Sequence, residues 1–230
     1  MACPKDALEL PCHKSVQKRH KGTGMIAAKA LGRPKDMEKR CAILDAGLKL
    51  FAERGMDGVP MEALAAEAGV SKVTVYANFK DKTAIMLAVV DRETARLDSL
   101  VAEAVQNEGP LAEKLTRVGM ALVDLISEPS RQAIERCLSM EKARHPELAQ
   151  RFFDAGPGHL RDILGEVLAE ACHCGAMDLR CSRTAAEDLL GLWLGFSAIE
   201  RRYSTVPPDP EALRQRVTRG VAFFLRAHAS

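Results

Sequence analysis

Two short helical patterns joined by a Gly-Val-Ser turn are the feature that most constrains the fold of this chain. In the first pattern, Met61–Ala68, small and apolar residues recur three and four positions apart, so they share one face of a helix. Gly69 can adopt the left-handed conformation that ends a helix, and Ser71 is a preferred N-cap for the helix that follows. The sequence therefore predicts two helices that meet at a tight turn.

The second helical pattern, Lys72–Phe79, has an outward face suited to nucleic acid. Val75 and Phe79 lie four positions apart and form its inner face, which leaves mainly short and polar side chains outside. A helix of this length that exposes Lys, Thr and Asn beside a Tyr can enter the major groove of DNA. The two patterns together predict a helix-turn-helix; the alternative is an ordinary solvated helix.

The same region resembles the TetR/AcrR family of bacterial transcriptional regulators. The motifs that carry the resemblance are Gly-Val-Ser-Lys-x-Thr-Val-Tyr over residues 69–76, Phe-Lys-x-Lys over residues 79–82, and the apolar pattern of Ile43–Phe51. The match extends from about Arg33 to Arg92, roughly 60 of the 230 residues. It implies an all-α protein with a three-helix helix-turn-helix DNA-binding domain and a larger helical ligand-binding and dimerisation domain.

The resemblance also implies roles for single positions. Those that family members turn toward the bases are Lys72, Val73, Thr74, Ala77 and Asn78. Those that hold phosphates are Ser71, Tyr76 and Lys82. Asn78 can form two hydrogen bonds with an adenine edge, whereas Val73, Ala77 and the Thr74 methyl group can contact thymine methyl groups.

The chain departs from the family at Val59-Pro60, immediately before the first helix of the motif. Many members have a Ser/Thr pair here, whose hydroxyl caps the helix and contacts a phosphate. Pro60 suits the first turn of a helix but has no hydroxyl to offer. We expect the phosphate contact to be lost, which lowers the expected affinity for DNA without changing the class of protein.

Charge is distributed unevenly along the chain, although the net charge of +2 is uninformative. Residues 1–40 contain ten Lys/Arg and four Asp/Glu, a net of +6. Residues 93–230 contain 17 Lys/Arg and 20 Asp/Glu, a net of −3. A basic front end followed by a mildly acidic body indicates a DNA-binding end joined to a regulatory part.

Three segments follow from these patterns: a flexible basic arm at 1–34, the helix-turn-helix domain at 35–82, and an effector-binding and dimerisation domain at 83–230. The alternative for the arm is that the natural chain begins at Met25. No run of 18 apolar residues and no secretory signal occurs, so a cytoplasmic location without membrane contact is expected.

Helical patterns continue through the rest of the chain, with no strand alternation or β-hairpin signal. The first helix is expected at Asp36–Arg54, and a long fourth helix, capped by Asp81, is expected to run to about Asn107. Further helices are expected at Leu111–Ser127, Ser130–Arg144, Pro146–Phe153, His159–Ala171, Thr184–Tyr203 and Pro210–Ala229, with an interruption at Gly156-Pro-Gly158 and a loop at Cys172–Ser182. Residues 140–158 also resemble the ligand-binding domain of the AefR-like branch of the family.

The helix expected at Thr184–Tyr203 has more apolar surface than one internal contact requires. Trp193, Phe196 and Tyr203 lie close to one face of it, with Leu189, Leu192 and Ile199 beside them. We predict that this face pairs with His159–Ala171 or Pro210–Ala229 in a homodimer, as family members do. The alternative is that the helix is simply central in its own protomer.

A small, largely apolar effector is expected to bind among the helices of residues 111–203. Soft or aromatic side chains that could line its pocket are Met120, Cys137, Met140, Phe152, Phe153 and Trp193, although at helical spacing most such residues belong to the core. The expected function is that of a DNA-binding transcriptional regulator, a repressor released from a palindromic operator. Release follows if the effector prefers a conformation in which the two recognition helices of the dimer have a different separation.

The cysteines leave one alternative function open. Cys172 and Cys174 flank His173, and Cys181 follows seven residues after Cys174; thiolate and imidazole groups are ligands for Zn²⁺ or Cu⁺. A cysteine-based metal or redox sensor on the same scaffold is therefore the alternative, although the spacing matches no strong zinc pattern. No Gly-rich phosphate loop, G-x-S-x-G or H-E-x-x-H motif occurs, so no enzyme, cofactor or bound metal is expected.

Overall fold

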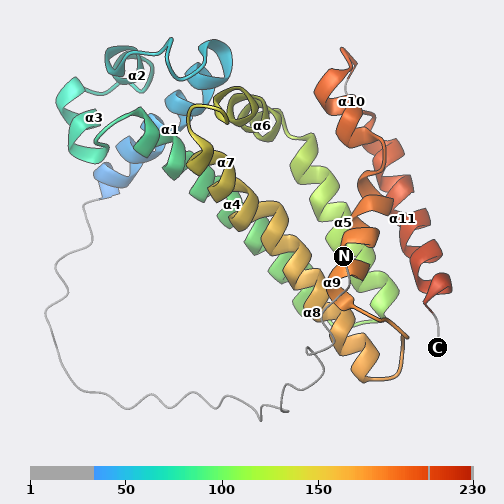
Figure 1. Ribbon diagram of the computed structural model, residues 1–230. Helices are drawn as coiled ribbons and strands as arrows, with labels where there is room; N and C mark the ends of the chain where they lie inside the picture. The colour runs from blue at the N-terminus through green and yellow to red at the C-terminus, as the bar shows by residue number, and fades with distance from the viewer. Residues whose placement is uncertain (1–33, 207, 229–230) are drawn as a thin grey trace, which may run out of the picture.

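The computed structural model describes residues 34–206 and 208–228 (Figure 1). No β-strand occurs in these ranges, and the predicted all-α class is confirmed. The arm expected at 1–34 lies outside the described residues apart from Pro34. The helices are α1 (Pro34–Arg54), α2 (Met61–Glu67), α3 (Lys72–Asn78), α4 (Lys82–Gln106), α5 (Leu111–Ser127), α6 (Pro129–Glu141), α7 (Pro146–Phe153), α8 (His159–His173), α9 (Ser182–Leu194), α10 (Ser197–Tyr203) and α11 (Pro210–Ala227).

Helices α1, α2 and α3 form one end of the molecule, and α4 runs from this end to the opposite one (Figure 1). α1 ends at Gly55 with a φ of 68°, and Gly69, with a φ of 65°, makes the turn after α2. Ser71 caps α3, because its hydroxyl accepts a hydrogen bond from the Thr74 amide at 3.1 Å. Asp81 caps α4 in the same way, with a hydrogen bond of 2.8 Å. The local stop and start signals therefore act where the sequence places them.

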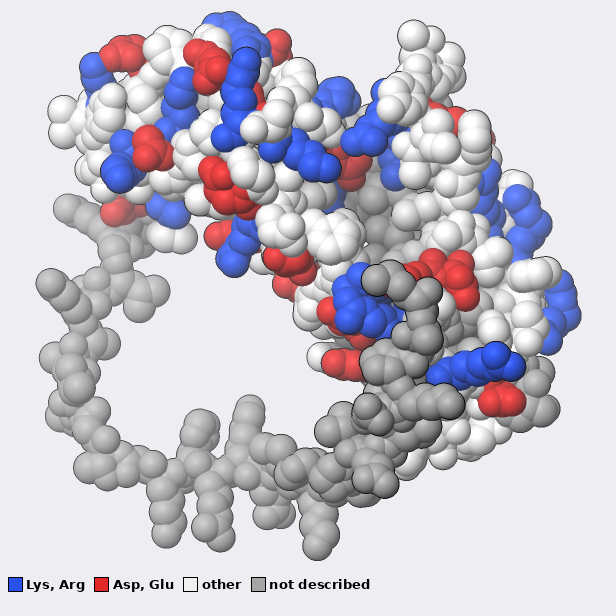
Figure 2. All heavy atoms as spheres, viewed as in Figure 1, with Lys and Arg blue, Asp and Glu red and all other residues white. Residues whose placement is uncertain are grey.

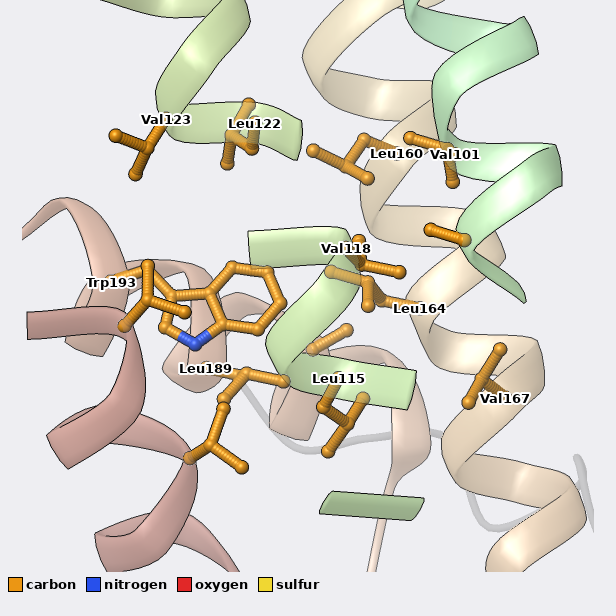
Figure 3. Close-up of a cluster of buried hydrophobic side chains, with 14 of the residues drawn as sticks. Val101, Leu115, Val118, Leu122, Val123, Leu160, Leu164, Val167, Leu189 and Trp193 are labelled. Atoms are coloured by element: carbon orange, nitrogen blue, oxygen red, sulfur yellow. The ribbon is translucent and has the colours of Figure 1, made fainter. Parts of the chain in front are cut away.

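Two hydrophobic cores hold the helices together. The N-terminal core contains the inner faces of α1–α3 and the first half of α4, and it also includes Ile134, Cys137, Leu138 and Leu148 from α6 and α7. The C-terminal core is built from the second half of α4 with α5, α8, α9 and α11, around Trp193 (Figure 3). Since α6 and α7 contribute to the N-terminal core, the hydrophobic packing does not divide at residue 82.

The single helix expected at Thr184–Tyr203 is wrong, because the chain breaks between α9 and α10. Gly195 has a φ of 49°, in the left-handed region that disfavours other residues. The Arg216 guanidinium of α11 lies against this break and donates a hydrogen bond to the Leu194 carbonyl at 2.9 Å. A Cβ at Gly195 would lie 2.2 Å from Arg216 Nη1, so the glycine and the arginine together define the break.

The interruption expected at Gly156-Pro-Gly158 is wrong in form, because α7 continues into α8 through a π-helical turn. This turn, η1, spans Asp154–Gly158 and contains Pro157. A proline cannot donate the hydrogen bond of a regular helix, and the wider π turn accommodates it without separating the two helices. The remaining helices lie within a few residues of their predicted bounds.

Candidate DNA-binding surface

The turn between α2 and α3 assembles the helix-turn-helix as a compact unit. α2 buries Leu64 and Ala65, while α3 buries Val75 and is followed by Phe79, only 4% exposed. These residues belong to the N-terminal core, so α3 has a fixed inner face. Its outer face is formed by the exposed residues Ser71, Lys72, Val73, Tyr76 and Ala77.

Val73 and Tyr76 are the largest uncharged side chains on this outer face. Val73 is 77% exposed and Tyr76 is 49% exposed, although both residue types usually find packing partners. A valine methyl group can contact the methyl group of thymine in the major groove, and a tyrosine hydroxyl can donate to a phosphate. The pair thus provides one contact to bases and one to the backbone of DNA.

Lys72 forms an ion pair with Glu62 of α2, and its ammonium group lies 5.8 Å from the centre of the Tyr76 ring. The hydrogen bond and the charge of Glu62 raise the pKa of Lys72. Because both side chains are more than half exposed, such a pair contributes little and exchanges easily. Lys72 can therefore leave Glu62 for a phosphate or a guanine edge at small cost.

Asn78 and Lys82, two further polar residues predicted to contact DNA, are engaged within the protein. Asn78 is half-buried, and its side-chain amide donates a hydrogen bond of 2.9 Å to the Thr74 carbonyl. The Lys82 ammonium donates a hydrogen bond of 2.7 Å to the Met56 carbonyl. Each would have to change or share a partner before it contacted DNA. The same holds for Lys72, which pairs with Glu62, and for the Ser71 and Thr74 hydroxyls, which lie 2.9 Å apart. Val73, Tyr76 and Ala77 need no such change.

The loop between α1 and α2 is held from both sides at Met56. Its carbonyl accepts from Lys82, and its amide donates a hydrogen bond of 3.1 Å to the Glu141 carboxylate at the end of α6. Glu141 is only 3% exposed, and its second oxygen, Oε2, accepts no hydrogen bond from a described residue. The exposed Arg144–Asp57 ion pair, 3.0 Å long, joins the same two segments. The C-terminal part of the chain, the regulatory part, therefore contacts the helix-turn-helix domain, hereafter the reader, directly.

The role of Glu141 was not predicted, although the amino-acid sequence contains a signal for it. Glu141 follows Ile134, Cys137 and Leu138 at helical spacing, so it lies on the apolar face of α6. A carboxylate on an apolar face indicates a buried acid with a specific partner. The partner itself, 85 residues away, is visible only in the fold.

Lysine and arginine do not form a single-sign patch on the α1–α3 end in the view of Figure 2; acidic residues lie among them. Two ion pairs account for part of this mixture: Lys49 with Glu67 at 2.6 Å, and Lys72 with Glu62. Exposed pairs of this kind are weakened by salt and by a competing polyanion. For α1–α3 to bind DNA through these lysines, DNA phosphates must therefore replace Glu67 and Glu62 as the partners of Lys49 and Lys72.

The start of α2 lacks a side-chain cap, as the Val59-Pro60 departure predicts. Pro60 is itself the N-cap, rather than the first helical residue, and it accepts no amide hydrogen bond through a side chain. We expect Pro60→Ser to be more stable than Pro60→Ala by about 1 kcal/mol, because serine can accept from the first-turn amides. Urea unfolding of both variants measures this difference. Equal unfolding midpoints would mean that α2 gains nothing from a cap.

The structure does not bring the residues predicted to line an effector pocket together. Trp193 is fully buried in the C-terminal core, and Met120 packs against that core. Cys137 and Phe152 lie instead with the N-terminal core. Met140 and Phe153, 56% and 47% exposed, lie at the surface. A pocket that used all of them would have to cross both cores.

The cysteines show no arrangement for metal chemistry within the described residues. No group of three or more His, Cys, Asp or Glu side chains in the described part of the chain could hold a metal ion. Cys172 and His173 line a shallow surface hollow at the α8–α9 connection, whereas Cys174 is exposed. Burial and the charge of Glu141 raise the pKa of Cys137 to about 11, so this thiol stays protonated and unreactive at neutral pH.

Comparison with known proteins agrees with this geometry. Residues 43–89 match the family described as "Bacterial regulatory proteins, tetR family", and residues 113–230 match "AefR-like transcriptional repressor, C-terminal domain". The two matches together define a helix-turn-helix transcriptional regulator, which is not an enzyme. The second match alone covers more than half of the chain. The chain therefore belongs to the TetR family, whose members bind DNA and act as dimers.

Individual relatives are more distant. The chain is 27% identical over 155 residues to the "Fatty acid metabolism regulator protein" of Bacillus subtilis (strain 168), covering 66% of this chain and 77% of that protein. It is 28% identical over 146 residues to the "HTH-type transcriptional activator FasR" of Mycolicibacterium smegmatis, covering 64% of this chain and 60% of that protein. A TetR-family regulator structure from Mesorhizobium loti superposes with a TM-score of 0.74 at 20% identity, over 86% of this chain and 100% of that one, which shows the fold alone.

Among the helices that the structure describes, none combines the length and the apolar character that a bilayer crossing requires.

Proposed function

We propose that this chain is a homodimeric repressor that a small, largely apolar effector releases from a palindromic operator. The observation that carries the proposal is the outer face of α3, where Lys72, Val73 and Tyr76 are exposed beside a capped N-terminus. The N-terminal residues of a recognition helix are those that contact base edges. Two such helices, one from each protomer, would read half-sites about one helical turn, roughly 34 Å, apart.

The test is a fluorescence-anisotropy titration with labelled duplexes that cover the DNA upstream of the chain's own gene. We expect tight binding by dimers that weakens steeply as salt rises, because each phosphate contact releases counterions. In the source organism, deletion should raise expression from that promoter if the chain represses, and lower it if it activates. Binding without salt dependence, or no binding to any duplex, would argue against a DNA-binding regulator.

The dimer interface is proposed to lie on α10 and α11. Large apolar side chains are exposed on these helices and directly next to α10: Phe196, Ile199, Tyr203, Val206 and Phe223. They form the proposed patch, since large apolar side chains left exposed together on a protomer are typical of a protein–protein contact. Trp193, which the sequence placed on the same surface, is fully buried within its own protomer and is not available to a partner.

We expect Phe196→Asp combined with Phe223→Asp to convert the dimer to a monomer at micromolar concentration, because a desolvated carboxylate in the interface has no partner. Sedimentation velocity measures the change in mass. The matched control is Met140→Asp, since Met140 is 56% exposed but lies on α6, away from the patch. A double variant that remained dimeric would place the interface elsewhere.

The coupling between effector and operator is proposed to run through α4 and α6. α4 begins directly after the helix-turn-helix and extends into the C-terminal core, whereas α6 ends at the loop that precedes α2. An effector shifts DNA binding only by its differential affinity for the two arrangements of these helices. The Bacillus subtilis relative is named as a regulator of fatty acid metabolism, and this name supports the proposal of an apolar effector for the present chain.

A further inference from the structure

A layer of buried polar residues separates the two hydrophobic cores. On α4, Val90 belongs to the N-terminal core and Leu97 to the C-terminal core. Glu93 and Thr94 lie between them, and each is only 3% exposed. Arg131 of α6, also 3% exposed, completes the layer. Most of the buried polar side chains that the structure describes are thus concentrated at the boundary between the reader and the regulatory part.

Arg131 is enclosed by three other elements. Its guanidinium carbon lies 4.2 Å from the centre of the Phe152 ring of α7. At the π turn η1, a Cβ added to Gly156 would lie 3.5 Å from Arg131 Nη2 and 3.6 Å from the Thr94 methyl group. The guanidinium therefore lies where α4, α6, α7 and η1 meet. π turns of this kind are frequent at functional sites.

The Arg131 guanidinium lacks the partners that burial demands. Nε and Nη1 are both inaccessible to solvent, and neither donates a hydrogen bond to a described residue. The nearest carboxylate is that of Glu135, 3.6 Å from Nε and beyond hydrogen-bonding distance. Burial accordingly lowers the pKa of Arg131. A buried guanidinium without hydrogen bonds destabilises a fold, because nothing replaces the lost water.

Apart from Glu135, the neighbouring acids Glu93 and Glu128 do not supply the missing contacts, because other arginines hold them. Glu93 pairs with Arg92 at 3.4 Å and with Arg96 at 3.1 Å. Arg96 also forms two parallel hydrogen bonds of 2.9 Å with Glu128. In this cluster Arg131 is the cation whose donors remain open.

We propose that Arg131 anchors the effector, through an oxyanion carried on an apolar body, and that a long-chain carboxylate has the required chemistry. This inference rests on the proposed effector-controlled function. A guanidinium binds a carboxylate through two parallel N–H···O bonds, and a carboxylate held by Nη1 and Nη2 would give the open Nη1 donor its acceptor. The apolar body would have to separate α4 from α8, where Val101 and Leu160 are buried and approach one another in the C-terminal core (Figure 3).

The position of Arg131 also explains how binding there reaches DNA. Arg131 lies in the first turn of α6 and Glu141 in the last, ten residues or about 15 Å apart along one helix. A ligand that draws the Arg131 end toward η1 tilts α6 and displaces the Glu141 carboxylate from the Met56 amide. The loop before α2 then loses its support from the regulatory part.

The test compares dodecanoate, below its micelle-forming concentration, with dodecanol, which has the same chain and no charge. We would measure thermal stabilisation of the whole protein and, separately, release of bound upstream DNA. The variants are Arg131→Met, which keeps an apolar stem, and Gly156→Ala, which adds a methyl group in ordinary contact with the guanidinium. The control is Arg151→Met, which removes an exposed arginine next to Phe152.

We expect dodecanoate, but not dodecanol, to stabilise the wild type and to release DNA. Arg131→Met and Gly156→Ala should raise the dodecanoate midpoint at least tenfold, while Arg151→Met leaves it unchanged. Arg131→Met should keep or raise the melting temperature without ligand, because a ligand anchor is not a fold stabiliser. A markedly lower melting temperature of Arg131→Met, equal action of both probes, or no response to dodecanoate would overturn the inference. If the protein still bound the upstream DNA in any of these cases, the inference about Arg131 would be wrong, but the proposed DNA-binding function would be unaffected.

Discussion

Glu141→Ala is expected to weaken binding to the upstream DNA about tenfold or more, although Glu141 contacts no part of the recognition helix. The substitution leaves the buried Met56 amide without an acceptor, and a hydrogen bond from a backbone amide to a carboxylate contributes about 1.5–3 kcal/mol. The loop that carries Met56 sets the start of α2, and α2 packs directly on α3. Anisotropy titration and urea unfolding, performed on the same preparation, measure both consequences.

Two variants separate positioning by Glu141 from a general loss of stability. Glu141→Gln retains an oxygen that can accept from the Met56 amide, so it should recover most of the DNA affinity. Arg144→Ala removes only the exposed ion pair with Asp57 and should cost less than about 1 kcal/mol. If Glu141→Ala bound DNA as tightly as Arg144→Ala, the contact from α6 to the loop would have no role in positioning the reader.

The part of the site that sequence could predict is the part specified locally. The Gly69 turn, the Ser71 cap and the inner position of Val75 depend on residues within one or two helical turns, and the structure places all three as expected. The outward positions of Val73 and Tyr76 are those that the family resemblance implies for contacts to DNA, whereas Thr74 and Asn78, expected outside from the periodicity, are half-buried. Short-range signals of this kind are unusually complete in this helix-turn-helix.

Contacts between distant segments set the features that sequence did not predict. The periodicity of residues 184–203 is continuous, and the break between α9 and α10 comes from Gly195 together with Arg216 of α11, which lies against it. Likewise Lys82 has the motif position of a phosphate contact, but the fold directs its ammonium to the Met56 carbonyl. An apolar sequence pattern also cannot distinguish residues that line a pocket from residues that pack in a core. This distinction matters most for Trp193, which was expected in a pocket and is fully buried in the C-terminal core.

Trp193→Ala is expected to destabilise the protein by about 3–5 kcal/mol, the usual cost of deleting a large aromatic side chain from a core. The indole is fully buried and lies between two glycines of neighbouring helices. A Cβ added at Gly119 of α5 would lie 3.1 Å from the indole, and one added at Gly220 of α11 would lie 3.2 Å from it. The two helices approach closely because these positions lack side chains, so the ring fills a space that cannot collapse when it is removed.

Urea unfolding followed by circular dichroism measures this cost, since Trp193 is the single tryptophan of the chain and its fluorescence is lost with it. Trp193→Phe should cost less, because it keeps an aromatic ring and removes an indole N–H that has no acceptor among the described residues. Phe153→Ala, at a half-exposed position on α7, should change stability little. If the free energy of unfolding of Trp193→Ala instead lay within about 1 kcal/mol of the wild-type value, the indole would line a ligand-binding space and would not stabilise the core.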